Sequence, residues 1–234
     1  MNMIKGDLSQ QLEPTLDKPT LRQRSNFAVQ HLMAAARFSR KCGEIENQNN
    51  GQPLGPFYDV EIGYVSATIL LATASLESYI NEVWADGEKS FPELTESIRL
   101  HLLELIEDKP ILEKFHRTLM VKGVEPFSKG AQPYQDAQAL IRLRNALVHF
   151  KPEWHDEQEQ HKKLEKLLIG KFEINPFIGE NSVFFPQQCM SYGCTKWAVF
   201  TAKDFVADFC YRTQLESKYF KFMDRINPIY VPDA

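Results

Sequence analysis

The residues best suited to chemistry lie close together in the segment from Ile141 to Phe150, which reads IRLRNALVHF. Arg144, Asn145 and His149 place a cationic, an amide and an imidazole group at the end of an otherwise apolar helical pattern. An arginine in such a pattern must either extend its guanidinium to solvent or find an anionic partner, because an isolated buried charge is very costly. The segment therefore predicts a site that binds an anion.

This arrangement resembles the HEPN superfamily of small α-helical domains, which carry an arginine, usually followed by a polar residue, and a histidine a few positions later. Arg144, Asn145 and His149 fit that pattern, with four residues between the arginine and the histidine. The run SLESYINEVW, residues 75 to 84, resembles the helix that packs against the motif helix in these proteins. The resemblance covers residues 57 to 225 in layout.

The resemblance implies a metal-independent endoribonuclease without a cofactor, and therefore RNA as its partner. In such cleavage the ribose 2′-hydroxyl attacks the neighbouring phosphate, which requires a base, an acid and positive charge on the phosphorane. His149 is expected to serve the proton steps beside Asn145, and Arg144 to hold two phosphate oxygens. The expected products carry a 2′,3′-cyclic phosphate and a 5′-hydroxyl.

The spacing of the motif adds a geometric condition. On a straight helix, residues five apart differ by about 140° in direction and about 7.5 Å in height, so Arg144 and His149 do not face the same way, whereas Asn145 and His149 do. HEPN proteins commonly pair these helices across a two-fold axis, which implies a homodimer through the motif helix. Arg142 and Lys151 would then hold flanking phosphates of a short RNA.

Glu77 and Asn81 are expected to support the site, because they lie one turn apart on the upstream helix and Glu77 could hold Arg144 in place. Two plainer interpretations stay open. Arg144 is then a surface residue paired with a carboxylate such as Glu77, and His149 is a cap at the negative end of its helix.

Several functions are compatible with these residues. The first is an endoribonuclease that acts as a toxin or a defence effector, for which an antitoxin protein is a candidate partner. The alternative is a non-catalytic dimeric module of the same fold that binds nucleotides, RNA or another protein. A helical adaptor without a nucleic-acid role is the third. In one branch of the superfamily a tyrosine two residues after the histidine is modified by a partner enzyme, but Lys151 stands at that position here.

The formal net charge of −4 argues against a protein that coats nucleic acid through bulk electrostatics, although a small basic site can exist on an acidic body. Charge is unevenly spread: residues 77 to 108 carry nine acidic and two basic side chains, and residues 117 to 151 carry two acidic and six basic ones. The basic part includes the motif.

The four cysteines do not form the dense framework of a small secreted protein, and the N-terminus lacks the apolar region of a signal peptide. The longest uncharged run, residues 62 to 76, is too short to span a bilayer. We therefore expect reduced thiols, a cytoplasmic location and no membrane segment. No metal is expected either, because the single Glu-x-x-His ending at His116 and the pair of Cys189 and Cys194 lack further ligands.

The periodicity of apolar residues predicts an all-α, up-down helical bundle with short peripheral helices and one long irregular loop before the C-terminal helix. Residues 1 to 20 read as a flexible arm, and residues 21 to 234 as one helical domain. The expected helices cover residues 21 to 46, the stripe from 62 to 83, residues 92 to 108, 110 to 121, 133 to 150 and 195 to 223. Residues 172 to 192 are expected to form a packed loop or short strands.

Three buried stripes follow from the same periodicity. In the first helix the stripe consists of Phe27, His31, Ala34, Ala35 and Phe38. In the second, predicted to be the central core helix, it consists of Ile62, Val65, Ile69, Ala72, Leu76, Ile80 and Val83. In the last it consists of Ala198, Ala202, Phe205, Val206, Phe209 and Cys210.

Overall fold

The computed structural model of the chain describes residues 24 to 154 and 159 to 232, so the predicted arm over residues 1 to 20 lies outside the described residues. All regular structure in those two ranges is helical, with no β-strand, which confirms the predicted all-α fold. The helices are α1 (Ala28–Gln48), α2 (Pro56–Ala85), α3 (Gly87–Ser90), α4 (Glu96–Ile106), α5 (Ile111–Val121), α6 (Tyr134–Val148), α7 (Gln160–Leu168) and α8 (Tyr192–Thr213), with short turns η1 (Phe184–Gln188) and η2 (Phe220–Phe222).

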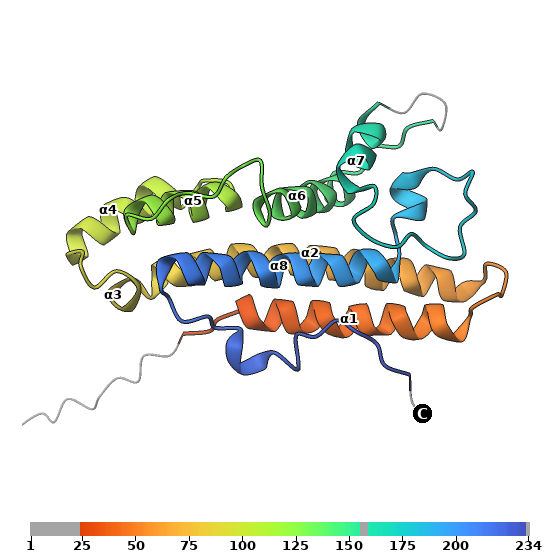
Figure 1. Cartoon of the computed structure of the whole chain (residues 1–234), viewed down its shortest axis with the longest axis horizontal. Coiled ribbons are helices and arrows are strands. Elements are labelled where there is room, and N and C mark those ends of the chain that lie inside the picture. Colours follow the sequence, from red (N-terminus) through yellow and green to blue (C-terminus); the bar gives the residue numbers. More distant parts are fainter. Residues whose placement is uncertain (1–23, 155–158, 233–234) are drawn as a thin grey trace, which may run out of the picture.

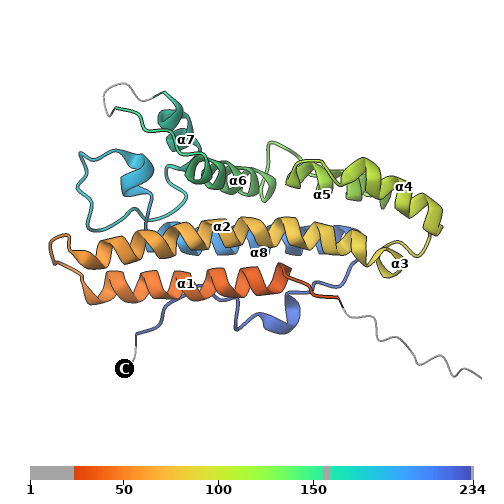
Figure 2. The same cartoon turned by 180° about the vertical axis from the view of Figure 1, so that it is seen from behind.

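Three long helices, α1, α2 and α8, lie side by side and form the body of the molecule (Figure 1). The shorter helices α4, α5 and α6 follow the side of α2 and α8 that faces away from α1, as both views show (Figure 2). Beyond the C-terminal end of α6 stand α7 and the loop that contains η1. The motif thus lies where the bundle meets this added lobe.

The central helix α2 confirms the prediction made from its period. It contacts α1, α8, α6 and α5, and one proline at its first turn suits a helix start. Apolar side chains at steps of three and four residues are buried along it, namely Val65, Ile69, Ala72, Leu76, Ile80 and Val83, with Ile62 partly buried. Packing against several neighbours explains why α2 carries the strongest apolar pattern in the chain.

The buried face of α1 differs from the predicted one by about one residue. Phe27 is 55% exposed, and the residues that are buried are Ala28, Leu32, Met33, Ala35, Ala36, Ser39, Cys42 and Gly43. The reason is close packing: a Cβ on Gly43 would lie 2.6 Å from the Cβ of Tyr230. Small side chains make up most of this buried face, and the large Phe38 is only partly buried, with its ring stacked on Tyr64 at 5.4 Å.

The stripe predicted for α8 is confirmed, but the predicted end of this helix is wrong. Its six predicted core residues are all buried. The helix ends at Thr213, well before residue 223, because Gln214 adopts a left-handed conformation with φ of 56°. The chain then turns back along the bundle, where Tyr219 is buried and packs edge-on against Tyr79 at 5.2 Å.

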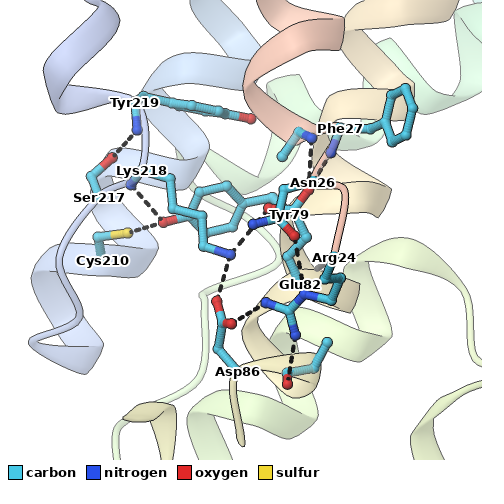
Figure 3. Close-up of polar contacts among 12 residues, drawn as sticks. Arg24, Asn26, Phe27, Tyr79, Glu82, Asp86, Cys210, Ser217, Lys218 and Tyr219 are labelled. Carbon is cyan, nitrogen blue, oxygen red and sulfur yellow. Dashed lines mark hydrogen bonds and ion pairs between the residues drawn. The ribbon is translucent and has the colours of Figure 1, made fainter. Parts of the chain in front are cut away.

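A polar cluster near the C-terminal end of α2 holds this returning segment (Figure 3). Lys218 Nζ lies 3.0 Å from Glu82 Oε2 and 2.8 Å from Asp86 Oδ2. The other oxygen of Glu82 accepts hydrogen bonds from the amides of Phe27 at 2.7 Å and Ala28 at 2.8 Å. A carboxylate is favourable there because the first amides of a helix lack partners and carry partial positive charge. Glu82 therefore caps α1 and anchors the C-terminal segment together.

The connection between α7 and α8 is the irregular loop that the sequence predicts, and it is anchored by buried polar groups. Asn175 Nδ2 donates to Met190 O at 2.6 Å and to Glu61 Oε1 at 3.2 Å. Glu46 Oε1 accepts from the Tyr192 amide at 2.6 Å. Burial, together with the neighbouring carboxyl of Glu46, raises the pKa of Glu61 to about 8. These contacts fix the loop against α1 and α2.

Candidate functional site

Helix α6 positions the predicted motif by burying its other face. Its buried residues are Tyr134, Ala137, Ala139, Leu140 and Leu143, which pack toward α2 and α8. Arg144 follows the last of them and is half-buried, at the boundary between the packed face and solvent. Asn145, one residue further around the helix, is exposed. The guanidinium of Arg144 and the side-chain amide of Asn145 therefore both lie at the surface of the same helical turn.

His149 occupies the C-terminal cap position of α6 through its backbone, whereas the plainer interpretation predicts a cap formed by its imidazole. Its amide donates to Asn145 O at 2.9 Å, and its φ of −110° and ψ of 41° depart from helical values. The imidazole is exposed, and within the described ranges no hydrogen bond holds the ring. Because the backbone leaves helical geometry here, the helical offset of about 140° does not dictate where the ring points.

The two residues predicted to support the site behave differently from that prediction. Asn81 accepts a hydrogen bond from Lys114 Nζ of α5 at 3.0 Å, so its amide is engaged with α5. Glu77 is exposed, and no ion pair or hydrogen bond joins it to Arg144 in the described part of the chain. Glu77 and Asn81 share one face of α2, and the place along α2 where α5 packs decides that Asn81 is engaged, which the sequence does not reveal.

Positive charge at the end of α6 comes from side chains alone. The C-terminal end of a helix carries partial negative charge, so the backbone here does not attract a phosphate. Arg142 and Lys151 are both exposed and flank Arg144 along the chain. Because Arg142 and Arg144 differ by about 200° in direction on the helix, they face different sides of α6, and each can pair with a separate phosphate.

His161 of α7 is a neighbour of the motif that the sequence prediction did not include. Its Nε2 lies 3.1 Å from Lys151 O, and its ring stacks on Phe150 with centroids 5.6 Å apart. The Phe185 ring packs nearly perpendicular to the imidazole with centroids 5.0 Å apart, and it also lies 6.1 Å from the Phe150 ring. His161 thereby holds the segment that directly follows His149. The available signal was its place three and seven residues before Leu164 and Leu168, which are buried on the same face.

Glu153 completes this connection between the motif and α7. Its carboxylate accepts hydrogen bonds from the amides of Gln160 at 3.1 Å and His161 at 3.2 Å, at the start of α7. Desolvation acts to raise its pKa, but these amides outweigh that effect and hold the pKa of Glu153 below its usual value. Glu153 Oε2 lies 3.8 Å from His161 Nδ1. The carboxylate is therefore ionised at neutral pH beside the imidazole.

The other residues considered as metal ligands from the sequence take part in ordinary structural contacts. Glu113 pairs with Arg117 one turn along α5, and the four cysteines are buried free thiols. In the described residues, no three His, Cys, Asp or Glu side chains gather at a spacing that would hold a metal ion. A hollow of about 1000 Å³ lies near the opposite end of α6, beside Pro133 and Asp136, and contains none of the predicted site residues.

Among the described residues, α2 is long and apolar enough to cross a membrane by length and composition. The core helix of a soluble protein meets the same criterion, and α2 packs against both α1 and α8. Compared with known proteins, the chain matches no family model, no curated protein and no solved structure. The resemblance to the HEPN superfamily therefore stays a prediction made from the residues of α6 and α2.

Proposed function

We propose that this protein is a metal-independent endoribonuclease of the HEPN type. The observation that supports the proposal is the end of α6, where a guanidinium, an amide and an imidazole emerge within six residues beside two exposed cations. Such a set can bind a phosphodiester and move protons near neutral pH.

Each residue has a defined part in the proposed reaction. Arg144 holds two non-bridging oxygens of the scissile phosphate, and Asn145 donates to the reacting groups from the same turn. His149 accepts the proton of the ribose 2′-hydroxyl as the 2′-oxygen forms its bond to phosphorus. The bond from phosphorus to the 5′-oxygen breaks, and that oxygen takes a proton from a second imidazole. The products are a 2′,3′-cyclic phosphate and a 5′-hydroxyl.

The second imidazole comes from a second copy of the chain. Two copies of α6 facing each other across a two-fold axis would supply two arginines and two histidines to one phosphate. The surface beside the motif supports such a contact, because the apolar side chains of Val148 and Trp154 are 50% and 78% exposed. Exposed apolar groups next to charged ones are typical of protein interfaces.

The biological setting follows from the activity. A cytoplasmic ribonuclease of this size is harmful to its own cell unless it is restrained. We therefore include in the proposal a role as a toxin or defence effector, held in check by an antitoxin protein. Expression of the wild type should slow growth, and expression of His149→Ala should not.

The direct test is incubation of purified protein with mixed RNA in EDTA. Wild type should cleave and leave 5′-hydroxyl ends, whereas Arg144→Ala and His149→Ala should not. His101→Ala is the matched control, because His101 is an exposed histidine on α4, away from α6. Cleavage that persists equally in both motif variants overturns the proposal. RNA binding without cleavage by the wild type would identify the non-catalytic module instead.

A further inference from the structure

A hollow of about 400 Å³ opens directly beyond the motif, between Phe150, α7 and the loop before α8. Phe150 follows His149 in the chain and forms one wall of the hollow, so the hollow begins one residue from the proposed catalytic imidazole. Arg144, Asn145 and His149 do not line this hollow. The residues that do line it therefore indicate which further part of a ligand the site could bind.

One wall of the hollow is built from stacked rings. Phe150 and His161 both line it, and their ring planes differ by only 28°. Phe150 is 46% exposed, which leaves ring surface open to a ligand. Pro186 adds a flat apolar surface on the side of the loop. Flat ligands such as nucleobases stack on surfaces of this kind with little dependence on sequence.

The rim of the hollow carries polar side chains that are free to form hydrogen bonds. Asn181, Ser182 and Gln187 line it, and within the described residues their side chains take part in no hydrogen bond. His161 is only 8% exposed and its Nδ1 lies 3.8 Å from Glu153 Oε2, so the imidazole and the carboxylate form a fixed wall behind this rim. The side chains free to bind a ligand are therefore the exposed amides of Asn181 and Gln187.

The loop that carries this rim is held in a defined shape. The side-chain amide of Gln188 donates to Gly179 O at 3.1 Å and to Glu180 O at 3.0 Å. The backbone of Gln188 also donates to Val183 O at 3.2 Å and accepts from Asn175 at 2.7 Å. The polar rim therefore stands on a fixed scaffold, as a binding site requires.

The charge of the hollow defines the class of ligand. Glu153 is the only charged side chain among the described residues that line it, and no lysine or arginine does, so the hollow disfavours a phosphate. A carboxylate accepts hydrogen bonds from the exocyclic amino groups of bases. Cytosine, adenine and guanine carry such a group, whereas uracil presents only carbonyl oxygens at the corresponding positions.

We propose that this hollow is a nucleobase subsite, which binds an amino-bearing base next to the cleaved phosphate and disfavours uracil. The inference rests on the proposed ribonuclease function for its place in the reaction. The phosphate itself lies toward Arg144 and Lys151, outside the hollow. The stacked rings hold the plane of the base, while Glu153, Asn181 and Gln187 contact its edge.

The test compares base preference at the cleavage site with direct binding of nucleotides. Sequencing of the 5′-hydroxyl ends should show few cleavages next to uracil for the wild type. The double variant Asn181→Ala/Gln187→Ala should still cleave, with that bias reduced at least several-fold. Gln135→Ala is the matched control, because it removes an exposed amide from the first turn of α6 and should leave the bias unchanged.

Binding of CMP and UMP to His149→Ala, measured by calorimetry, does not depend on cleavage. CMP should bind several-fold more tightly than UMP, and the added double substitution should weaken CMP binding and reduce the difference. Equal binding of both nucleotides, or a cleavage bias that the double variant retains, overturns the subsite while leaving the ribonuclease proposal intact. Selective CMP binding by a protein that cleaves no RNA supports the subsite and overturns the ribonuclease proposal.

Discussion

Two polar clusters stand at helix C-terminal ends in this protein, and their side chains are used in opposite ways. At the end of α2, Glu82 and Asp86 are engaged by Lys218, and Glu82 also by two backbone amides (Figure 3). At the end of α6, Asn145 and His149 are exposed, and Arg144 is only half-buried. A cluster whose groups bind one another stabilises the fold, whereas a cluster that presents its groups to solvent is available to a ligand.

The largest expected effect is on the α6 side of this comparison. Replacing His149 with alanine should lower RNA cleavage by about 100-fold or more, because a lost general acid or base typically costs that much. The free energy of unfolding should change by less than about 0.5 kcal/mol, as expected for an exposed side chain. Cleavage assays and urea denaturation on the same preparation measure both quantities. A large loss of stability would show that His149 is a structural cap instead.

The α2 cluster should show the reverse behaviour. Glu82→Ala should lower the free energy of unfolding by about 2 to 4 kcal/mol, because it leaves two amides at the start of α1 without their acceptor and removes one carboxylate from Lys218. Cleavage per folded molecule should stay the same. Urea denaturation measures the effect, and Glu88→Ala, an exposed acidic residue on α3, is the control. An unchanged unfolding midpoint would contradict the anchoring role of Glu82.

A third acidic group, Glu61, sharpens the comparison through its pH dependence. Its pKa of about 8 in the folded protein lies above its usual value of 4.5, so the folded state retains a proton that the unfolded chain releases. This group's contribution to stability is therefore complete below about pH 4.5 and is lost as the pH rises through 8. Glu61→Gln should flatten the fall in urea midpoint between pH 5 and 8.

The control for Glu61 is Glu77→Gln, since Glu77 lies on the same helix but is exposed. That variant should keep the slope of the wild type. The same slope in Glu61→Gln would show that the proton resides on the neighbouring Glu46 or that other groups dominate. The buried carboxyl of Glu61 thus gives stability a pH dependence that the exposed end of α6 should lack.

The smallest expected effect concerns the cations that flank the motif. Arg142→Ala should weaken RNA binding about equally for all sequences and reduce the dependence of log affinity on log salt by about 0.7, because one phosphate contact to a single strand is lost. Titrations at several salt concentrations, carried out with the inactive His149→Ala background, measure this slope. An unchanged slope would place Arg142 outside the RNA path.

The helices and the central core could be predicted from sequence because they depend on local periodicity. Apolar residues at steps of three and four identify the buried stripes of α2 and α8, and Pro152 soon after His149 marks the end of α6. The motif itself lies within one helical turn and the cap that follows it. These features require no knowledge of which segments meet in space.

Four features could not be predicted because they depend on tertiary packing. They are the face that α1 buries, the end of α8 at Thr213, the contact of Asn81 with α5 and the place of His161 beside Phe150. Each depends on residues far apart in the chain, such as Tyr230 against Gly43 or Lys218 against Glu82. A helical period reports which positions share a face, but close approach and ion pairing between distant segments select the face that is buried and the turn where a helix stops. Periodicity and residue spacing thus predict an all-α chain with a basic motif at a helix end, whereas the ring-lined hollow beside that motif exists only in the folded arrangement.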